Sequence, residues 1–535
     1  MKKNLLSLIA LVLSLCMLVA LAACNKDNKN DNGTTTESTT PNEVNGTTPA
    51  PSDDDPIGSG NTEIIVPPTH EHKFNRQKTY IDHIAEDATC TTPALYYYSC
   101  SCGEVGTQTF VGEKAANCKY ENGACIWCGK AEPAETEGLI FTAIRNGEAY
   151  MLTGYEGTAS EIYIPSTHNQ KPVIRVSYGV FKEDKNVTSV VIGNNIKYID
   201  SNAFADCVNL TSVVIGCDVQ EIGEYAFGWC ESLQTVNLPD ALTLIGKGAF
   251  WMCSAMPSVT LPYGLTQLGE DAFGRCDSLT SVKIPDSVTS MGRKVFSWCL
   301  ALESIEVDQD NEHYSSLQGN LYNKEQTTIL QYAMGKTDAD FAIPASVTTI
   351  GYYAFTYCEN LVNLEIPNSV TDIHYGAFRE MSGVKYNTKD SLNYLGNEEN
   401  PYLYLAGVAD KSITVAKIDS NCRFIGDSAF SFCTNLTNVI FGEDSKLTTI
   451  GTNAFFYCGS LVSITIPASV TSLHAPFYAC PGLTSIAFEN AENWYFVATR
   501  DDFENGVEGT AVDLSDSAAN VENFSGDHEW YSWYK

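Results

Sequence analysis

The sequence repeats one short phrase at a fixed interval, and this repeat limits the fold more than any other feature. Ala-Phe or Val-Phe, two variable residues and Cys recur every 23 residues, ending at Cys207, Cys230, Cys253, Cys276 and Cys299. The phrase resumes later in the chain and ends at Cys358, Cys433 and Cys458, and again at Cys480 with Pro in place of Ala. A fixed short period predicts one supersecondary unit stacked many times, which forms a long and regular surface. Nothing in such a stack demands a catalytic centre.

Each unit can be interpreted physically. Residues 279–299 read LTSVKIPDSVTSMGRKVFSWC, and Val282 and Ile284 alternate with polar residues, which predicts a short half-buried strand. Pro285 ends the strand because proline cannot donate to a ladder and favours a turn. Gly292 stands where most units have glycine, which indicates either a positive φ or the close approach of a neighbouring coil. Stacked coils would place their strands parallel on one face, about 4.8 Å apart.

The period is interrupted twice, between Cys299 and Cys358 and between Met381 and Cys433. We interpret both interruptions as longer coils or small hairpins that project from the solenoid. Two histidines, His374 and His474, replace the repeat glycine. We interpret them as substitutions in the coil turns, not as catalytic bases.

The N-terminus has the features of a secretion signal. Lys2 and Lys3 precede an apolar run over residues 5–20, and Leu-Ala-Ala then leads to Cys24. The LAAC sequence resembles a bacterial lipobox, which implies a diacylglycerol thioether on Cys24 and attachment to the outer face of a membrane. The alternative is an ordinary signal peptide with Cys24 incidental. No later run of the sequence approaches the length of a transmembrane helix.

The composition divides the chain into five parts. Residues 1–24 are a lipoprotein signal peptide, and residues 25–69 are a Thr/Asn/Pro-rich tether that cannot bury enough apolar surface to fold. Residues 70–135 are a small Cys/His segment, residues 136–500 are the repeat solenoid, and residues 501–535 are an acidic, aromatic C-terminal cap.

The small Cys/His segment has two structural interpretations. Its cysteine and histidine spacings suit tetrahedral zinc, and a short segment with little core needs such a constraint. Exported proteins also form disulfides, and six cysteines can pair completely, so disulfides or a mixed state are the alternatives. The candidate zinc ligands are His70, His72, Cys90, Cys100, Cys102, Cys118, Cys125 and Cys128.

Charge and motifs exclude several classes of function. The chain carries 32 basic and 65 acidic residues, a net charge of −33, and no basic cluster follows the signal region. Nucleic acid is therefore not an expected partner, since phosphate binding needs lysine and arginine patches. HExxH, GxSxG, P-loop and dinucleotide-binding patterns are all absent from the sequence. We predict that the protein is not an enzyme and uses no catalytic cofactor.

The units resemble a known family. The phrases IPDSVTS, IPASVTTIG, IPNSVTDI and IPASVTS ahead of Ala-Phe-x-x-Cys resemble the BspA-type bacterial leucine-rich repeat. The resemblance covers most of residues 136–500. It implies a surface protein without catalytic activity that adheres to host matrix proteins, other cells or mucosal surfaces. Ligand identity does not follow, because the residues that would contact a ligand are the variable ones.

Three rows of residues recur in register along the solenoid. We expect the repeat cysteines to fill the corner of each coil as small buried hydrophobes, although a metal or redox ladder is the alternative. The residue before each cysteine should be exposed or half-exposed, because this row includes Glu, Asp and Arg. It forms either a contact surface or edge packing, and its aromatic members are Trp229, Trp298, Tyr357, Phe432 and Tyr457.

The outward residues of the predicted strands form the third row. They are short and polar, which suits either a broad protein or glycan surface or simple solvation. These residues are Ser212, Thr235, Asn237, Ser258, Thr260, Ser281, Lys283, Ser304, Glu306, Asn363, Glu365, Asn438, Ser463 and Thr465.

The sequence therefore predicts an exported, lipid-anchored surface protein that binds a protein or glycan through its solenoid. The alternatives are an envelope scaffold that holds a partner from the same cell and, more remotely, an unrecognised hydrolase.

Overall fold

The structure is a computed structural model that describes residues 84–86, 93–99, 105–114, 120–121, 124–125, 128, 130–504, 506–525 and 531–535. The predicted signal peptide and tether lie outside these residues. The early strands are antiparallel: β1 (Ile84–Glu86), β2 (Pro93–Ser99) and β3 (Val105–Lys114) form one sheet, and β4 (Tyr120–Glu121) pairs with β5 (Ala124–Cys125).

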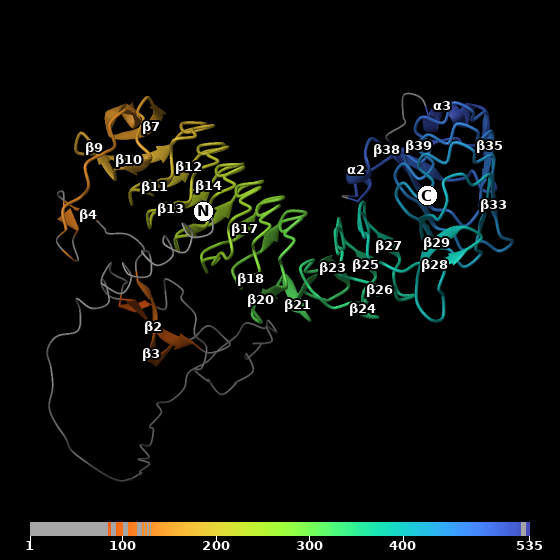
Figure 1. The fold of residues 1–535 in the computed structure, drawn as a ribbon, viewed down its shortest axis with the longest axis horizontal. Coiled ribbons are helices and arrows are strands. Elements are labelled where there is room, and N and C mark those ends of the chain that lie inside the picture. The colour runs from red at the N-terminus through yellow and green to blue at the C-terminus, as the bar shows by residue number, and fades with distance from the viewer. Residues whose placement is uncertain are drawn as a thin grey trace, which may run out of the picture. The chain divides into compact units, whose positions relative to one another are not determined.

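The following residues confirm the predicted repeat solenoid, and most coils contribute two strands to two parallel ladders (Figure 1). The first ladder lies where the sequence predicts it. In the first part of the chain it comprises β8 (Glu161–Ile164), β11 (Ser189–Ile192), β13 (Ser212–Val214) and β15 (Thr235–Asn237), then β18 (Ser281–Ile284) and β20 (Ser304–Val307). Val190 pairs with Val213, and Val213 with Val236, so the register advances by 23 residues.

The second ladder was not predicted, and it is built from strands of mostly two residues just before the repeat glycine. It comprises β10 (Lys171–Val176), β12 (Tyr198–Ile199), β14 (Glu221–Ile222), β16 (Leu244–Ile245), β17 (Gln267–Leu268) and β19 (Ser290–Met291). In each two-residue strand, the second residue is buried or half-buried, while the first points outward. We call the outer surface of this ladder the short-strand face.

The repeat glycines are required by close approach. A Cβ at Gly246 would lie 2.8 Å from the carbonyl carbon of Gly223 in the preceding coil, and one at Gly269 would lie 2.4 Å from the backbone nitrogen of Lys247. Neither glycine has a positive φ. Of the two reasons that the sequence suggested, the structure supports contact between neighbouring coils.

Positive φ occurs instead at the residue before each repeat cysteine, which belongs to the return segment of the coil. All eleven residues of this row, from Glu183 to Ala479, have φ between 56° and 65°. Their N–H groups mostly donate to the next coil: Trp229 N to Trp251 O at 2.6 Å, for example, and Arg275 N to Ser297 O at 2.8 Å. These hydrogen bonds tie the return segments together and hold non-glycine residues in a conformation that is otherwise unfavourable.

The interior is a file of stacked rings. Phe227 and Phe250 have centroids 5.4 Å apart with planes 7° from parallel, and Phe250 and Phe273 are 5.2 Å apart at 5°. This spacing is close to the distance between strands in a sheet, so it confirms that the coils lie flat on one another. The same arrangement returns later in Phe430, Phe455 and Phe477.

The repeat cysteines are buried, as the packing interpretation predicted. The Cys253 thiol donates to Phe227 O at 3.2 Å, and the Cys230 thiol donates to Phe204 O in the same way. Burial raises the pKa of Cys207 to about 12 and also raises the pKa of Cys253. Thiols of this kind stay protonated and unreactive at neutral pH.

Each interruption of the period is a hairpin, as one of the two interpretations predicted. In the first, β21 (Tyr314–Leu317), β22 (Asn320–Asn323) and β23 (Thr328–Gln331) are antiparallel, and β23 then starts a new parallel ladder. The second has β28 (Asn387–Lys389), β29 (Leu392–Leu395) and β30 (Tyr404–Val408), and β30 likewise pairs in parallel with the next coil.

The hairpins divide the solenoid into three blocks, which we define as residues 139–308, 314–384 and 387–535. The first block also opens with an antiparallel pair, β6 (Leu139–Ile144) and β7 (Ala149–Tyr155), joined by η2 (Arg145–Gly147), and β9 (Thr167–His168) flanks β10. The second block continues with β24 (Asp340–Ala342), β25 (Thr349–Ile350), β26 (Asn363–Glu365) and β27 (Asp372–Ile373). Three hydrophobic cores correspond approximately to these blocks.

The third block ends in a cap. Its coils hold β31 (Val415–Ile418), β32 (Phe424–Ile425), β33 (Asn438–Phe441), β34 (Thr449–Ile450), β35 (Ser463–Ile466), β36 (Ser472–His474) and β37 (Ser485–Phe488). The cap comprises β38 (Trp494–Val497), α2 (Arg500–Glu504), β39 (Thr510–Val512), α3 (Ala519–Ser525) and β40 (Ser532–Tyr534). Because β40 runs antiparallel to β36, it covers the last exposed edge of the ladder.

Candidate functional site

Most of the predicted strand-face residues do lie on the first ladder and point outward. Most are exposed, whereas Ser212, Asn237 and Ser304 are half-buried. Neighbouring coils align them in pairs, such as Ser281 beside Ser304 and Lys283 beside Glu306. They form a polar surface without a deep pocket.

Two of these residues do not lie on a strand. Ser258 and Thr260 are exposed, but residues 254–266 contain no strand, so this part of the prediction is wrong. Pro257 lies directly before Ser258 and has no N–H to donate to the preceding coil. The first ladder is therefore interrupted between β15 and β18, while the short-strand ladder continues through this coil.

The residues before the repeat cysteines are all exposed or half-exposed, as predicted. In the third block, Phe432 and Tyr457 are each 52% exposed, with ring centroids 5.7 Å apart. The ammonium group of Lys411 lies 5.7 Å from the Phe432 ring. These contacts make a mixed aromatic and cationic surface, of a composition that is common where proteins meet.

A second aromatic group, where the first two blocks meet, joins Trp298 and Tyr357 of the same row to Trp251, which lies one residue before the row. Trp298 lies 5.7 Å from Trp251 and 6.3 Å from Tyr357, measured between ring centroids. The Arg275 guanidinium lies 5.6 Å from the Trp298 ring. The row therefore contains two clusters, which we call the Trp298 cluster and the Phe432 cluster.

Little of the predicted zinc or disulfide segment can be located. Of the eight candidate ligands, the structure describes Cys125, which is buried, and Cys128, which is exposed. The other six, and the predicted lipidation site Cys24, lie outside the described residues. No helix in the described parts of the chain is long and apolar enough to cross a membrane.

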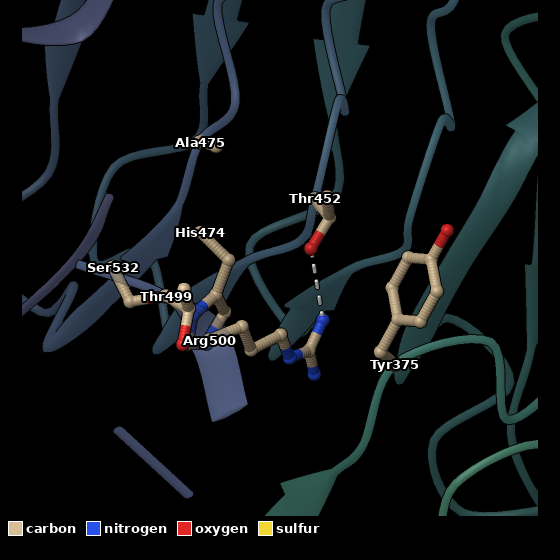
Figure 2. A pocket seen from close by; sticks show the side chains of 7 residues that line it. All are labelled: Tyr375, Thr452, His474, Ala475, Thr499, Arg500 and Ser532. Carbon is tan, nitrogen blue, oxygen red and sulfur yellow. Dashed lines mark hydrogen bonds between the residues drawn. The ribbon is translucent and has the colours of Figure 1, made fainter. Parts of the chain in front are cut away.

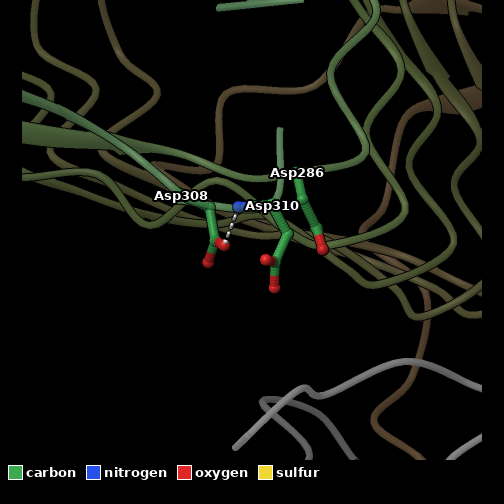
Figure 3. A group of neighbouring side chains, drawn as sticks. All are labelled: Asp286, Asp308 and Asp310. Carbon is green, nitrogen blue, oxygen red and sulfur yellow. Dashed lines mark hydrogen bonds between the residues drawn. The ribbon is translucent and has the colours of Figure 1, made fainter. Parts of the chain in front are cut away.

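Three carboxylates meet at the end of the first block, where the sequence analysis predicted no site. The oxygens of Asp286, Asp308 and Asp310 lie within 4.8 Å of one another, and all three side chains point the same way (Figure 3). Oxygen ligands of this kind could hold a hard cation such as Ca²⁺. The Lys283 ammonium lies 3.2 Å from Asp308 and already supplies positive charge there.

Among the described residues, two hollows that the sequence analysis did not identify lie beside the short strands. The first, of about 350 Å³, lies in the first block and is lined by Tyr178, Tyr198, Ile199, Asp200, Ser201, Glu221, Gly223 and Leu244. The second, of about 240 Å³, lies beside the cap and is lined by Tyr375 of the second block and by Thr452, His474, Ala475, Thr499, Arg500 and Ser532 of the third (Figure 2).

Arg500 lines the second hollow and is held in place by polar contacts. Its guanidinium pairs with Asp427 at 2.8 Å, donates to Ile373 O at 2.6 Å and contacts Thr452 Oγ1 at 3.4 Å. Figure 2 shows the side chain extending between Thr452 and Tyr375. Arg500 therefore fastens the cap to coils of the second and third blocks.

His474 forms the wall of the same hollow. It is buried, and its Nδ1 lies 3.0 Å from Ser532 Oγ. Burial, together with the positive charge of Arg500, holds the pKa of His474 well below its usual range. The imidazole is therefore neutral and structural, as the substitution interpretation predicted. His374, at the equivalent position, contacts Asp372 at 3.0 Å.

Comparison with solved structures gives bacterial leucine-rich repeat proteins. A leucine-rich cell surface protein from Faecalibacterium prausnitzii is 26% identical, with 68% of this chain and 96% of that chain covered and a TM-score of 0.42. A leucine-rich repeat protein from Eubacterium ventriosum is 22% identical, with 66% of this chain and 83% of that chain covered and a TM-score of 0.41. The pneumococcal vaccine antigen PcpA is 16% identical, with 67% of this chain and 98% of that chain covered and a TM-score of 0.41.

No match was found among curated proteins. The family described as "BspA type Leucine rich repeat region" matches in six copies over residues 174–303, 327–399 and 408–499, more than half of the chain. The gaps between the matched segments overlap the two hairpins that separate the blocks. The chain therefore belongs to the family of BspA-type leucine-rich repeat proteins.

Proposed function

We propose that this protein is exported, held at the outer face of a bacterial membrane by lipid on Cys24, and binds a macromolecular ligand there. The ligand is a protein or a glycan, and the binding surface is the row that contains the Trp298 and Phe432 clusters. The strand-face residues supply the polar part of the contact.

The composition of this row carries the proposal. Aromatic and arginine side chains are enriched at protein interfaces, and Phe432 and Tyr457 keep half of their surface in solvent. Hydrogen bonds between coils fix the backbone beneath them, so little conformational entropy is lost when a ligand binds. A rigid row of exposed rings is therefore suited to binding.

The decisive experiment compares ligand binding by the full chain and a matched pair of variants. We expect that a panel of matrix proteins, bacterial surface proteins and glycans will yield a ligand of modest affinity. The double variant Phe432→Ala, Tyr457→Ala should weaken its binding at least 10-fold. Leu300→Ala, which truncates an exposed side chain outside both clusters, is the control. Equal binding by both variants would remove the row from the proposal.

The second candidate is an envelope scaffold that holds a partner of the producing cell. Pull-down from those cells, with the natural chain and with Cys24→Ala, separates the two functions. A partner from the same cell that is lost with the lipid supports the scaffold. Intact-mass measurement of the exported protein tests the lipid itself and also reports zinc or disulfides in residues 70–135.

A further inference from the structure

The first hollow of the short-strand face has the chemistry of a small-ligand site. Three consecutive coils place Arg175, Tyr198 and Glu221 side by side in register on their outward surface. Asp200 and Ser201 follow the strand of Tyr198, and Tyr178 stands in the loop after β10. The lining of this groove therefore combines two aromatic rings with carboxylate and hydroxyl groups, and the Arg175 guanidinium lies beside Tyr198 and Asp200.

An aromatic ring is available for stacking. Tyr178 is 65% exposed although it lines the groove, whereas Tyr198 is half-buried and has the Arg175 guanidinium 4.6 Å from its ring centroid. A ligand with an apolar face would cover the Tyr178 ring and remove it from water. Tyr198 also lines the groove.

The charges of the groove disfavour an anionic ligand. Arg175 pairs with Asp200 at 2.7 Å, so this pair contributes no net charge, and Glu221 adds one negative charge. An anionic ligand would therefore meet the Glu221 carboxylate. A neutral polyol suits these groups, because its hydroxyl groups donate to the carboxylates and exchange hydrogen bonds with the Ser201 hydroxyl.

The size of the groove limits the ligand further. Its volume of about 350 Å³ lies at the lower end of the range for small-molecule sites, roughly 300–1,000 Å³. One or two sugar rings fit this space. The hollow beside the cap is smaller, and the Arg500 guanidinium that lines it is already bound to Asp427 and Ile373 O, so the larger site belongs to the first block.

We propose that this groove binds a neutral saccharide, with a pyranose ring stacked on Tyr178 and its hydroxyl groups bonded to Asp200, Ser201 and Glu221. The inference rests on the proposed surface-binding function and names a ligand class and a separate site for it. It places a glycan contact on the short-strand face, away from the row of aromatic clusters.

Saturation-transfer difference NMR and calorimetry on the full chain test this, with galactose, N-acetylgalactosamine, lactose and sialyllactose as probes. We expect a neutral probe to bind with Kd on the order of 1 mM, about −4 kcal/mol. Sialyllactose should bind more weakly than lactose, because its carboxylate would face Glu221. A lysine-rich peptide is included as the cationic competitor.

Variants locate the site. Tyr178→Ala should weaken saccharide binding at least 10-fold and Glu221→Gln several-fold, whereas Tyr178→Phe keeps the ring and should retain binding. Tyr386→Ala, which removes a half-exposed tyrosine far along the chain, is the control and should bind normally. Unchanged circular dichroism and melting of Tyr178→Ala show that the variant is folded.

The inference is overturned if no neutral probe binds, if Tyr178→Ala binds as well as the natural chain, or if only the lysine-rich peptide binds. The macromolecular ligand panel is repeated with the same variants. If macromolecular binding persists while the saccharides fail, the groove inference alone is wrong. If both fail, the proposed function is wrong as well.

Discussion

The first and third blocks differ in which residues lie over the outer face of their short strands. In the first block, Arg175 comes from the ladder itself, pairs with Asp200 and leaves the groove beside it open. In the third, Arg500 comes from the cap, pairs with Asp427 and lines a smaller hollow (Figure 2). The Arg175 side chain is 39% exposed and the Arg500 side chain 11%. The regular coils are thus alike, and the flanking elements decide which part of the face can meet a ligand.

The largest expected effect concerns what the two blocks share, the file of stacked rings. Phe250→Ala leaves a cavity in this file and should lower the free energy of unfolding by about 3–5 kcal/mol. Phe432→Ala removes the same ring from an exposed position and should cost about 0.5 kcal/mol. Urea unfolding of both variants measures the difference. Similar losses would contradict the stacked interior.

The two Arg–Asp pairs test the comparison directly. Arg500→Ala leaves the partly buried Asp427 carboxylate without its cation and should destabilise the third block by about 2–4 kcal/mol, below the range for a fully buried pair. Arg175→Ala breaks a more exposed pair and should cost less than about 1 kcal/mol. Hydrogen exchange of residues 472–474 and 532–534 reports the loosening of the cap. If the cap stays protected in Arg500→Ala, strand pairing and apolar contacts hold the cap without Arg500.

Acid should destabilise the third block more than the first, because the third block contains the buried His474. Its pKa is lowered in the folded state, so the unfolded chain takes up a proton near pH 6.5 while the folded chain resists it. Stability is therefore full above about pH 6.5 and falls as the pH decreases below it. His474→Asn should remove about 1–2 kcal/mol of this loss by pH 5. The exposed His313→Asn is the control, and equal acid profiles for the two variants would contradict the assignment.

The smallest effect concerns the cysteine row, which is the same in both blocks. Cys253→Ala and Cys458→Ala each remove a buried sulfur that contacts the preceding coil and should cost about 1 kcal/mol. Burial raises the pKa of both thiols, so iodoacetamide at pH 8 should leave them unlabelled in the native state. Rapid native labelling of either residue, measured by peptide mass spectrometry, would argue against a packing role.

The sequence predicted the coil well because its period is a local property. Phe227, Phe250 and Phe273 recur at equal intervals, so their stacking follows from the stacking of any two coils. The alternation before Pro285 also located the strands of the first ladder, except at 258–260, where Pro257 changes the local backbone. A two-residue strand such as Tyr198–Ile199 is too short to show a period of two and was missed.

The two hollows could not be predicted in the same way, because a period shows which residues are equivalent and not which of them border a space. In the first hollow, Tyr198, Glu221 and Leu244 share the 23-residue spacing, as do Tyr178 and Ser201, but the short-strand face was not identified. In the second hollow, Arg500 contacts Ile373 across 127 residues of sequence. Periodicity describes what neighbouring coils do to one another, whereas this contact arises where the periodic part of the chain meets the cap.

The left-handed residues before the cysteines have a consequence for how such a protein changes over generations. Main-chain bonds, and not side chains, fix their conformation, so Glu, Trp, Met, Arg and Tyr occupy equivalent places in one scaffold. Mutation can therefore replace the side chains of this row one at a time while the hydrophobic core stays unchanged. The protein can thus acquire a new ligand while it keeps the same fold.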